Sequence, residues 1–127
     1  MQRFRLAPVV LGASFFACGG GRPSAPVNPG ALDRGEAARE IANAKTRARA
    51  ECSSLEGPRG NAHVTTTVAP AGNVVDVAFD VGYLPDDASL RFVGTPKGDC
   101  VLRSFRSIRL TAFAGAPTPM GTYLTLD

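Results

Sequence analysis

Three cysteines, one histidine and a few aspartates are the side chains of this 127-residue chain that could do chemistry. Cys52 and Cys100 stand alone in the sequence, far from each other and from His63, so they lack the ligand spacing of a zinc site. A Ser-His-Asp arrangement would need His63, but the chain has no G-x-S-x-G nucleophile motif. We therefore expect no catalytic residue, no bound metal and no cofactor.

The aspartates and one glycine-containing segment are interpreted as structural. The neighbours Asp86 and Asp87 and the pair Asp76 and Asp80 could suggest acid–base chemistry or calcium binding, but the spacing of a calcium loop is absent. Residues 94–98 (GTPKG) begin a predicted helix, as phosphate-binding loops do, yet the G-x-x-x-x-G-K-[ST] order is missing. We interpret this segment as a helix cap.

The first 17 residues have the layout of a secretory signal peptide. Arg3 and Arg5 precede an apolar stretch over residues 7–17, which Cys18 and three glycines follow. The apolar stretch is about eleven residues long, whereas about 20 residues are needed to span a bilayer. We therefore predict an export signal over residues 1–17 rather than a permanent transmembrane anchor.

Residues 15–18 (FFAC) resemble the lipobox of bacterial lipoproteins. The resemblance implies that Cys18 is acylated and becomes the mature N-terminus, which would anchor the protein to a membrane. Residues 18–30 are rich in Gly and Pro and are predicted to be a tether, with the folded domain at 31–127. No Asp follows Cys18, and in this the chain resembles lipoproteins that are sorted to the outer membrane. The resemblance implies an outer-membrane lipoprotein facing the periplasm; the alternative is cleavage nearby and a soluble secreted protein.

The basic character of the chain comes mainly from this signal. The net charge is +3 and the pI is about 9.1. Cleavage before Cys18 removes Arg3 and Arg5, which leaves twelve basic side chains against eleven acidic ones. A nearly neutral domain has no electrostatic footprint for a polyanion, so nucleic acid is not expected as a partner.

Acylation of Cys18 would leave two cysteines to pair with each other. Cys52 and Cys100 would then form one disulfide in an oxidising compartment. The bridge would close a loop of about 49 residues, which is worth on the order of 4 kcal/mol in the chain-entropy model.

Two helices are predicted. Residues 32–50 begin with Asp33 as N-cap and Glu36 three residues later, and the apolar positions that follow have helical spacing: Ala37, Ala38, Ile41, Ala44 and Ala48. The second helix begins after Thr95 as N-cap, with Pro96 in its first turn. Its apolar face comprises Val101, Leu102, Phe105 and Ile108, and the disulfide would tie the end of one helix to the start of the other.

A β-hairpin is predicted from two alternating segments, 62–69 and 74–81, around the turn at 70–73. The inward positions would be Val64, Thr66 and Val68 on the first strand, and Val75, Val77, Phe79 and Val81 on the second. Further strands are expected at 109–113 and 121–126, with a short one near 91–93. The sequence thus predicts an α+β fold in which two helices pack on a small, mostly antiparallel sheet.

This order of elements resembles the C-terminal domain of TonB-type energy transducers, and more closely the TonB-like domains of myxobacterial gliding-motility and envelope proteins. The resemblance spans residues 31–126 and depends on Leu32-Asp33-Arg34, Cys52, the hairpin motif at 61–75 and Asp99-Cys100-Val101. The R-W-x-F-P ending of that family is absent, because the chain has no Trp. The resemblance implies a fold and a binding habit rather than energy transduction.

The expected function is therefore non-enzymatic binding or scaffolding in the envelope. An extended segment of an envelope protein could add to a sheet edge, for which we favour the last strand: Tyr123, Leu124, Thr125 and Leu126. One alternative is a secreted enzyme or enzyme-inhibitor subunit with its site in residues 82–91. Another is a purely structural envelope protein.

Overall fold

The computed structural model describes residues 30–82 and 87–127. The elements follow in the order α1 (Arg34–Cys52), β1 (Gly60–Val68), β2 (Val74–Asp80), the 3₁₀ helix η2 (Ser89–Phe92), α2 (Pro96–Arg106) and β3 (Thr118–Leu126). Two helices and a three-stranded antiparallel sheet confirm the predicted α+β class. The predicted signal peptide, Cys18 and all of the tether except Gly30 lie outside the described residues.

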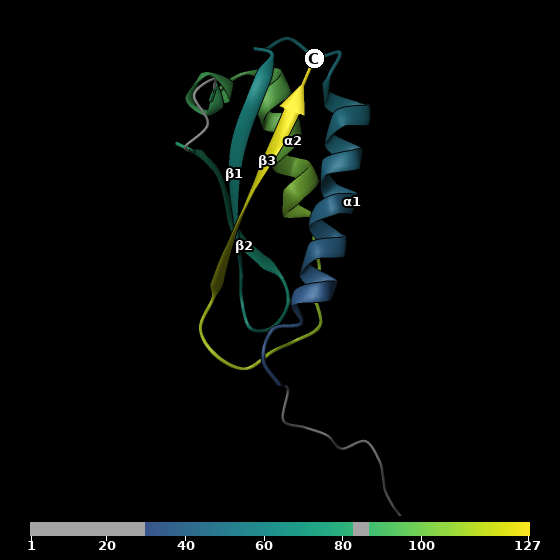
Figure 1. Cartoon of the computed structure of the whole chain (residues 1–127), viewed down its shortest axis with the longest axis vertical. Coiled ribbons are helices and arrows are strands. Elements are labelled where there is room, and N and C mark those ends of the chain that lie inside the picture. Colours follow the sequence, from purple (N-terminus) through teal and green to yellow (C-terminus); the bar gives the residue numbers. More distant parts are fainter. Residues whose placement is uncertain (1–29, 83–86) are drawn as a thin grey trace, which may run out of the picture.

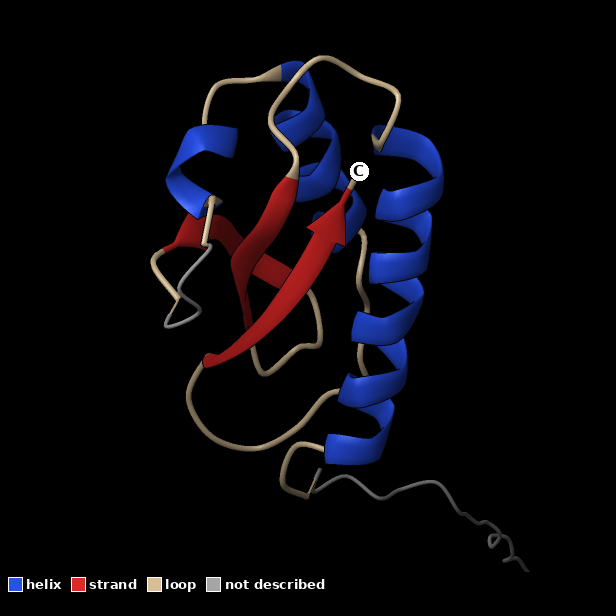
Figure 2. Ribbon diagram, turned by 45° about the horizontal axis from the view of Figure 1, so that its top comes forward, coloured by secondary structure: helices blue, strands red, loops and turns tan. Residues whose placement is uncertain are grey.

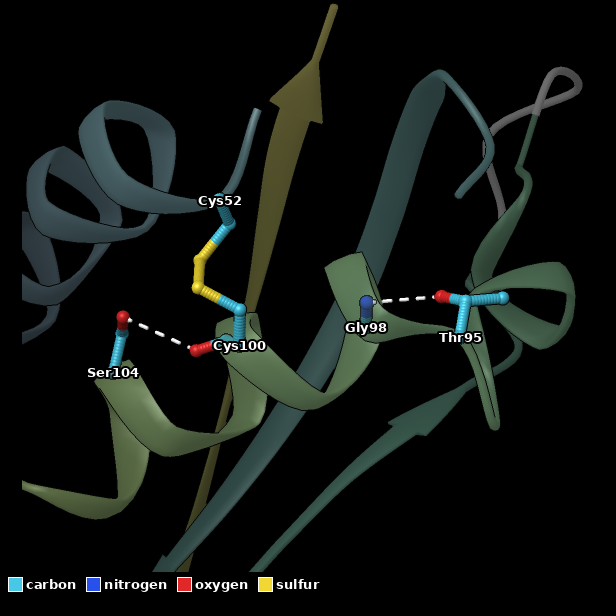
Figure 3. Close-up of a disulfide and its surroundings, with 5 residues drawn as sticks. All are labelled: Cys52, Thr95, Gly98, Cys100 and Ser104. Atoms are coloured by element: carbon cyan, nitrogen blue, oxygen red, sulfur yellow. Dashed lines mark hydrogen bonds between the residues drawn. A yellow bond between two sulfur atoms is a disulfide. The ribbon is translucent and has the colours of Figure 1, made fainter. Parts of the chain in front are cut away.

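Both helices begin where the sequence predicts. The side chain of Asp33 accepts a hydrogen bond from the backbone N–H of Glu36 at 3.0 Å. The side chain of Thr95 accepts one from Gly98 N–H at 2.9 Å, as Figure 3 shows. Each bond satisfies an N–H group that has no partner within its own helix, which is the reason helices begin at such residues.

The predicted disulfide joins the two helices. Cys52 is the last residue of α1 and Cys100 lies in the first half of α2, with their Cα atoms 5.6 Å apart (Figure 3). Both cysteines are buried. The buried face of α1 is otherwise made of alanines, whose small side chains let α1 approach α2 closely.

The sheet has the strand order β2-β1-β3, and both pairings are antiparallel. α1 lies on the side of β3 away from β1, while α2 lies behind the sheet (Figures 1 and 2). The predicted hairpin is confirmed, and the inward positions of its first strand are buried: Val64, Thr66 and Val68. The core between sheet and helices also contains Phe92, Phe105, Ile108, Leu124 and Leu126.

Two of the four inward positions predicted for the second strand are wrong. Thr67 pairs with Asp76 and Val68 pairs with Val74, so Val75 is an extra residue in a β-bulge. The bulge turns Val75 to solvent, with 56% of its surface exposed. Val81 follows the last residue of β2 and is also exposed, because the ladder has ended there.

Two further strand predictions are wrong. Residues 91–93 overlap the 3₁₀ helix η2, which buries Phe92 in the core. Residues 109–113 run beside the hairpin turn instead of joining the sheet: Leu110 N–H donates to Gly72 C=O at 2.9 Å, and Phe113 N–H donates to Pro70 C=O at 2.8 Å. The turn provides these two backbone acceptors but no continuous row of partners, so residues 109–113 do not form a strand.

Within the described residues, no helix has both the length and the apolar character needed to cross a membrane.

Candidate functional site at the edge of β3

β3 is an edge strand, and the residues predicted as a partner-binding edge lie in its second half. The side chains of Leu124 and Leu126 are buried in the core, so they are not available to a partner. Thr125 is exposed, and its hydroxyl donates to the side-chain oxygen of Asn61. Recognition at this edge would therefore depend on the backbone and on neighbouring side chains.

Two hydrogen bonds of β1 show toward which side of the strand its alternate residues direct their backbone N–H and C=O groups. The carbonyl of Asn61 accepts a hydrogen bond from Ala88 N–H at 2.7 Å. The N–H of His63 donates to the hydroxyl of Ser89 at 2.6 Å. Both groups point toward the η2 side of β1, which is the side away from β3.

The β3 residues opposite these two are Thr125 and Tyr123. In an antiparallel ladder the two members of a non-hydrogen-bonded pair point their backbone groups away from each other. Thr125, Tyr123 and, two residues earlier, Gly121 therefore direct their N–H and C=O groups away from β1. Pro119 has the same parity, which places its missing N–H on the outer side, where a proline is tolerated.

A groove lies between α1 and the side of β3 that faces away from β1. It has a volume of about 440 Å³, and its lining residues are Ala38, Ile41, Ala42, Lys45, Thr46 and Arg49 from α1 with Gly121 and Thr122 from β3. A second hollow of about 260 Å³ continues it toward the start of both elements and shares Ala38, Ile41 and Gly121 with the first. The alanines have small side chains and the glycine has none, so the space between helix and strand is left unfilled.

A polar ladder crosses the outer face of the sheet. His63 of β1 pairs with Asp80 of β2 on one side and with Tyr123 of β3 on the other. The Nδ1 atom of His63 contacts a carboxylate oxygen of Asp80, and its ring lies 4.8 Å from the Tyr123 ring at 57°. Thr65 donates its hydroxyl hydrogen to the other carboxylate oxygen at 2.6 Å.

Hydrogen bonds lower the pKa of two carboxylates in this region. The Thr65 hydroxyl and then His63 hold the pKa of Asp80 below its ordinary value of 3.8. The pKa of Asp87 is also lowered, by its hydrogen bonds with Ser89 and the N–H of Gly82. These bonds tie the end of β2 and the start of η2 to the sheet.

The chemistry open to the ladder is limited. In enzymes, a histidine that acts as a general base often has its Nδ1 in contact with a carboxylate, as His63 has here. The ring is largely covered, however, since its side chain is only 17% exposed and a Cβ at Gly121 would lie 2.8 Å from Nε2. The nearby Ser89 is buried, and its oxygen accepts the hydrogen bond from the backbone of His63. The ring of His63 and the hydroxyl of Ser89 are therefore both largely covered and already engaged with neighbouring groups.

The alternation predicted for β1 puts His63 on the outer face, but the partners of His63 depend on strand register, which the sequence of one strand does not specify. The groove was not predicted either; its signal in the sequence is the pattern of small residues on α1 and the glycine of β3: Ala38, Ala42 and Gly121. Among residues 30–82 and 87–127, no three His, Cys, Asp or Glu side chains are placed to hold a metal ion.

No family model, no curated protein and no solved structure matches this chain. The resemblance to TonB-type domains therefore depends on the residues of the chain itself.

Proposed function

We propose that this chain is a non-enzymatic envelope lipoprotein whose domain binds an extended segment of another envelope protein at the edge of β3. A lipid on Cys18 would hold it at the outer membrane, and residues 18–30 would let the domain reach its partner in the periplasm. The domain is proposed to be a TonB-like binding module without an energy-transducing role.

One observation supports this function best: alternate residues of β3 direct their backbone groups away from β1, toward the side where α1 borders a groove. A partner segment that pairs with an edge strand gains affinity from main-chain hydrogen bonds and specificity from alternate side chains. The groove could accept those alternate side chains, because alanines and a glycine line much of it. Backbone pairing also explains why buried Leu124 and Leu126 do not prevent recognition.

Replacing Thr125 tests the edge, because its N–H points away from β1. Thr125→Pro removes that N–H and leaves the ladder with β1 in place, whereas Thr125→Val keeps the N–H and loses only the hydroxyl bond to Asn61. We expect cross-linking to the envelope partner to be lost in the proline variant and retained in the valine variant, with circular dichroism verifying the fold of both. Equal cross-linking by the two variants would show that this edge is not the site.

A second candidate function is an enzyme or inhibitor subunit that acts at the outer face. The contact between His63 and Asp80, close to Asp87 and Ser89 of the 82–91 region, favours it. A hydrolase activity of the purified chain that His63→Gln abolishes without loss of folding would support this alternative over the binding module.

A further inference from the structure

The charged side chains that line the groove are all basic. Lys45 and Arg49 lie in its larger part, and Arg34 lies in the smaller part near the start of α1. Within residues 30–82 and 87–127, none of the three forms an ion pair with an acidic side chain. Their charge is therefore available to a ligand in the groove.

The acidic residues of α1 lie on another side of the helix. Successive residues of a helix are rotated by about 100°, which separates Glu36, Glu40 and Glu51 from the groove side. The carboxylate of Glu36 accepts hydrogen bonds from the N–H and the hydroxyl of Thr111 at 3.0–3.1 Å. Arg47 also lies away from the groove, because its guanidinium donates to Ser104 C=O at 3.0 Å.

This segregation is a local property of the groove. Residues 31–127 carry eleven basic and eleven acidic side chains, so the domain has no net charge that would attract anions in general. A basic lining in a balanced domain concentrates a positive potential at one place. The positive charge of the groove lining therefore favours acidic ligands at the groove, although the domain as a whole does not attract anions.

We infer that the segment taken up by the β3 edge and the groove is an acidic extended peptide, with Asp or Glu at alternate positions facing α1. This inference deepens the proposed function and depends on it. Every second side chain of an added strand faces the same way, so Lys45 and Arg49 would meet carboxylates of one face. The methylene groups of those acidic side chains would lie against Ala38, Ile41 and Ala42.

Two occupants from this chain itself match the groove less well. The β3 strand of a second copy has no charged side chain between Thr118 and Leu126, so it offers no partner to the groove cations. The predicted tether at 18–30 contains Arg22, three prolines and no acidic residue. An acidic segment from another protein satisfies both the backbone edge and the charge.

Synthetic peptides test the inference on the full chain, purified in mild detergent. The probe is a fluorescent eight-residue peptide of sequence ETEVETEV, compared with the twins KTKVKTKV and QTQVQTQV. We expect the acidic peptide to bind at least about tenfold more tightly than the lysine twin at low salt, as measured by fluorescence anisotropy. The advantage should shrink in about 0.5 M salt, which screens exposed charges.

A pair of matched double variants locates the effect. Lys45→Gln with Arg49→Gln should weaken binding of the acidic peptide about tenfold and leave the glutamine twin unchanged. Arg103→Gln with Arg106→Gln removes two exposed charges from the last turn of α2 and serves as the control. The control changes the net charge by the same amount, so it should bind the acidic peptide like the wild type.

Each other outcome overturns the inference in a recognisable way. Equal binding of the three peptides, still abolished by Thr125→Pro, would refute the acidic preference and leave the edge-binding function standing. Equal weakening by both double variants would mean that general charge, not the groove, attracts the peptide. No binding of any peptide, or binding that Thr125→Pro does not change, would refute both proposals. Self-association through β3 in light scattering, reversed by Thr125→Pro, would make a second copy the occupant.

Discussion

Lys45 of α1 and Gly121 of β3 line the same groove, although one comes from the first helix and the other from the last strand. The helix residue brings a cation to the groove, and the strand residue brings backbone groups without a side chain to obstruct them. Their relative position depends on how α1 is held. The Cys52–Cys100 disulfide ties the end of α1 to α2, and α2 in turn packs behind the sheet.

The disulfide is expected to supply a large share of the stability. Cys52→Ala with Cys100→Ala should lower the free energy of unfolding by about 2–5 kcal/mol, because the open chain regains entropy over a long loop. Urea titration followed by circular dichroism measures the change. Reductant should shift the wild-type midpoint in the same direction and leave that of the double variant unchanged; a wild type insensitive to full reduction would contradict the prediction.

The predicted covalent scheme comprises cleavage before Cys18, acylation of Cys18 and the disulfide between Cys52 and Cys100. Intact mass spectrometry tests all three at once. Protein extracted from native membranes should begin at Cys18, carry the mass of attached acyl groups, and have two hydrogen atoms fewer than the all-thiol form. A Cys18→Ser variant should lose the acyl mass and leave the membrane fraction. An unacylated chain with free thiols at Cys52 and Cys100 would contradict the scheme.

Two threonines of β1 should respond oppositely to the same substitution. Thr66 is buried, and its hydroxyl has no hydrogen-bond partner among the described residues, so Thr66→Val should stabilise the fold by about 1 kcal/mol. Thr65→Val removes a donor to Asp80 and should destabilise it by up to about 1 kcal/mol. Parallel urea titrations compare the two, and shifts of the same sign would contradict the assigned roles.

Asp80 should make the stability depend on pH at the acidic end. Hydrogen bonds from Thr65 and His63 lower its pKa in the folded state, so its contribution is present above its ordinary value of 3.8 and is lost as the pH falls through the lowered value. Asp80→Asn should therefore be less stable than the wild type at pH 6, by at most about 1 kcal/mol because the carboxylate is half exposed.

The stability gap between these two proteins should close as the pH is lowered toward 2. Asp76→Asn, at an exposed position of the same strand, controls for the loss of a carboxylate as such. A gap that widens as the pH falls would contradict the role assigned to Asp80.

Sequence patterns correctly predicted the structural features that depend only on residues close together in the chain. The caps Asp33 and Thr95, the alternation of β1 and the turn at 70–73 each depend on neighbours within a few residues, and the structure has all of them. The turn requires a glycine at position 72, because the residue has φ +99° and a Cβ there would lie 1.9 Å from the carbonyl oxygen of Leu110.

Features that depend on register or on distant packing could not be read from the sequence. The bulge that exposes Val75 depends on how β1 and β2 align, and residues 109–113 look like a strand but find only the acceptors of a turn. The ladder from Asp80 through His63 to Tyr123 needs three strands in register. The groove needs α1 placed beside β3, which no local pattern on either element specifies.

If the outward backbone groups of β3 receive a partner strand, amide hydrogen exchange by NMR will detect the new hydrogen bonds. With the acidic peptide at saturation, the amides of Gly121 and Thr125 should exchange markedly more slowly, while those of Thr122 and Leu124, which point to β1, should change little. Unchanged exchange at Gly121 and Thr125 with the peptide bound would show that the peptide does not pair with β3.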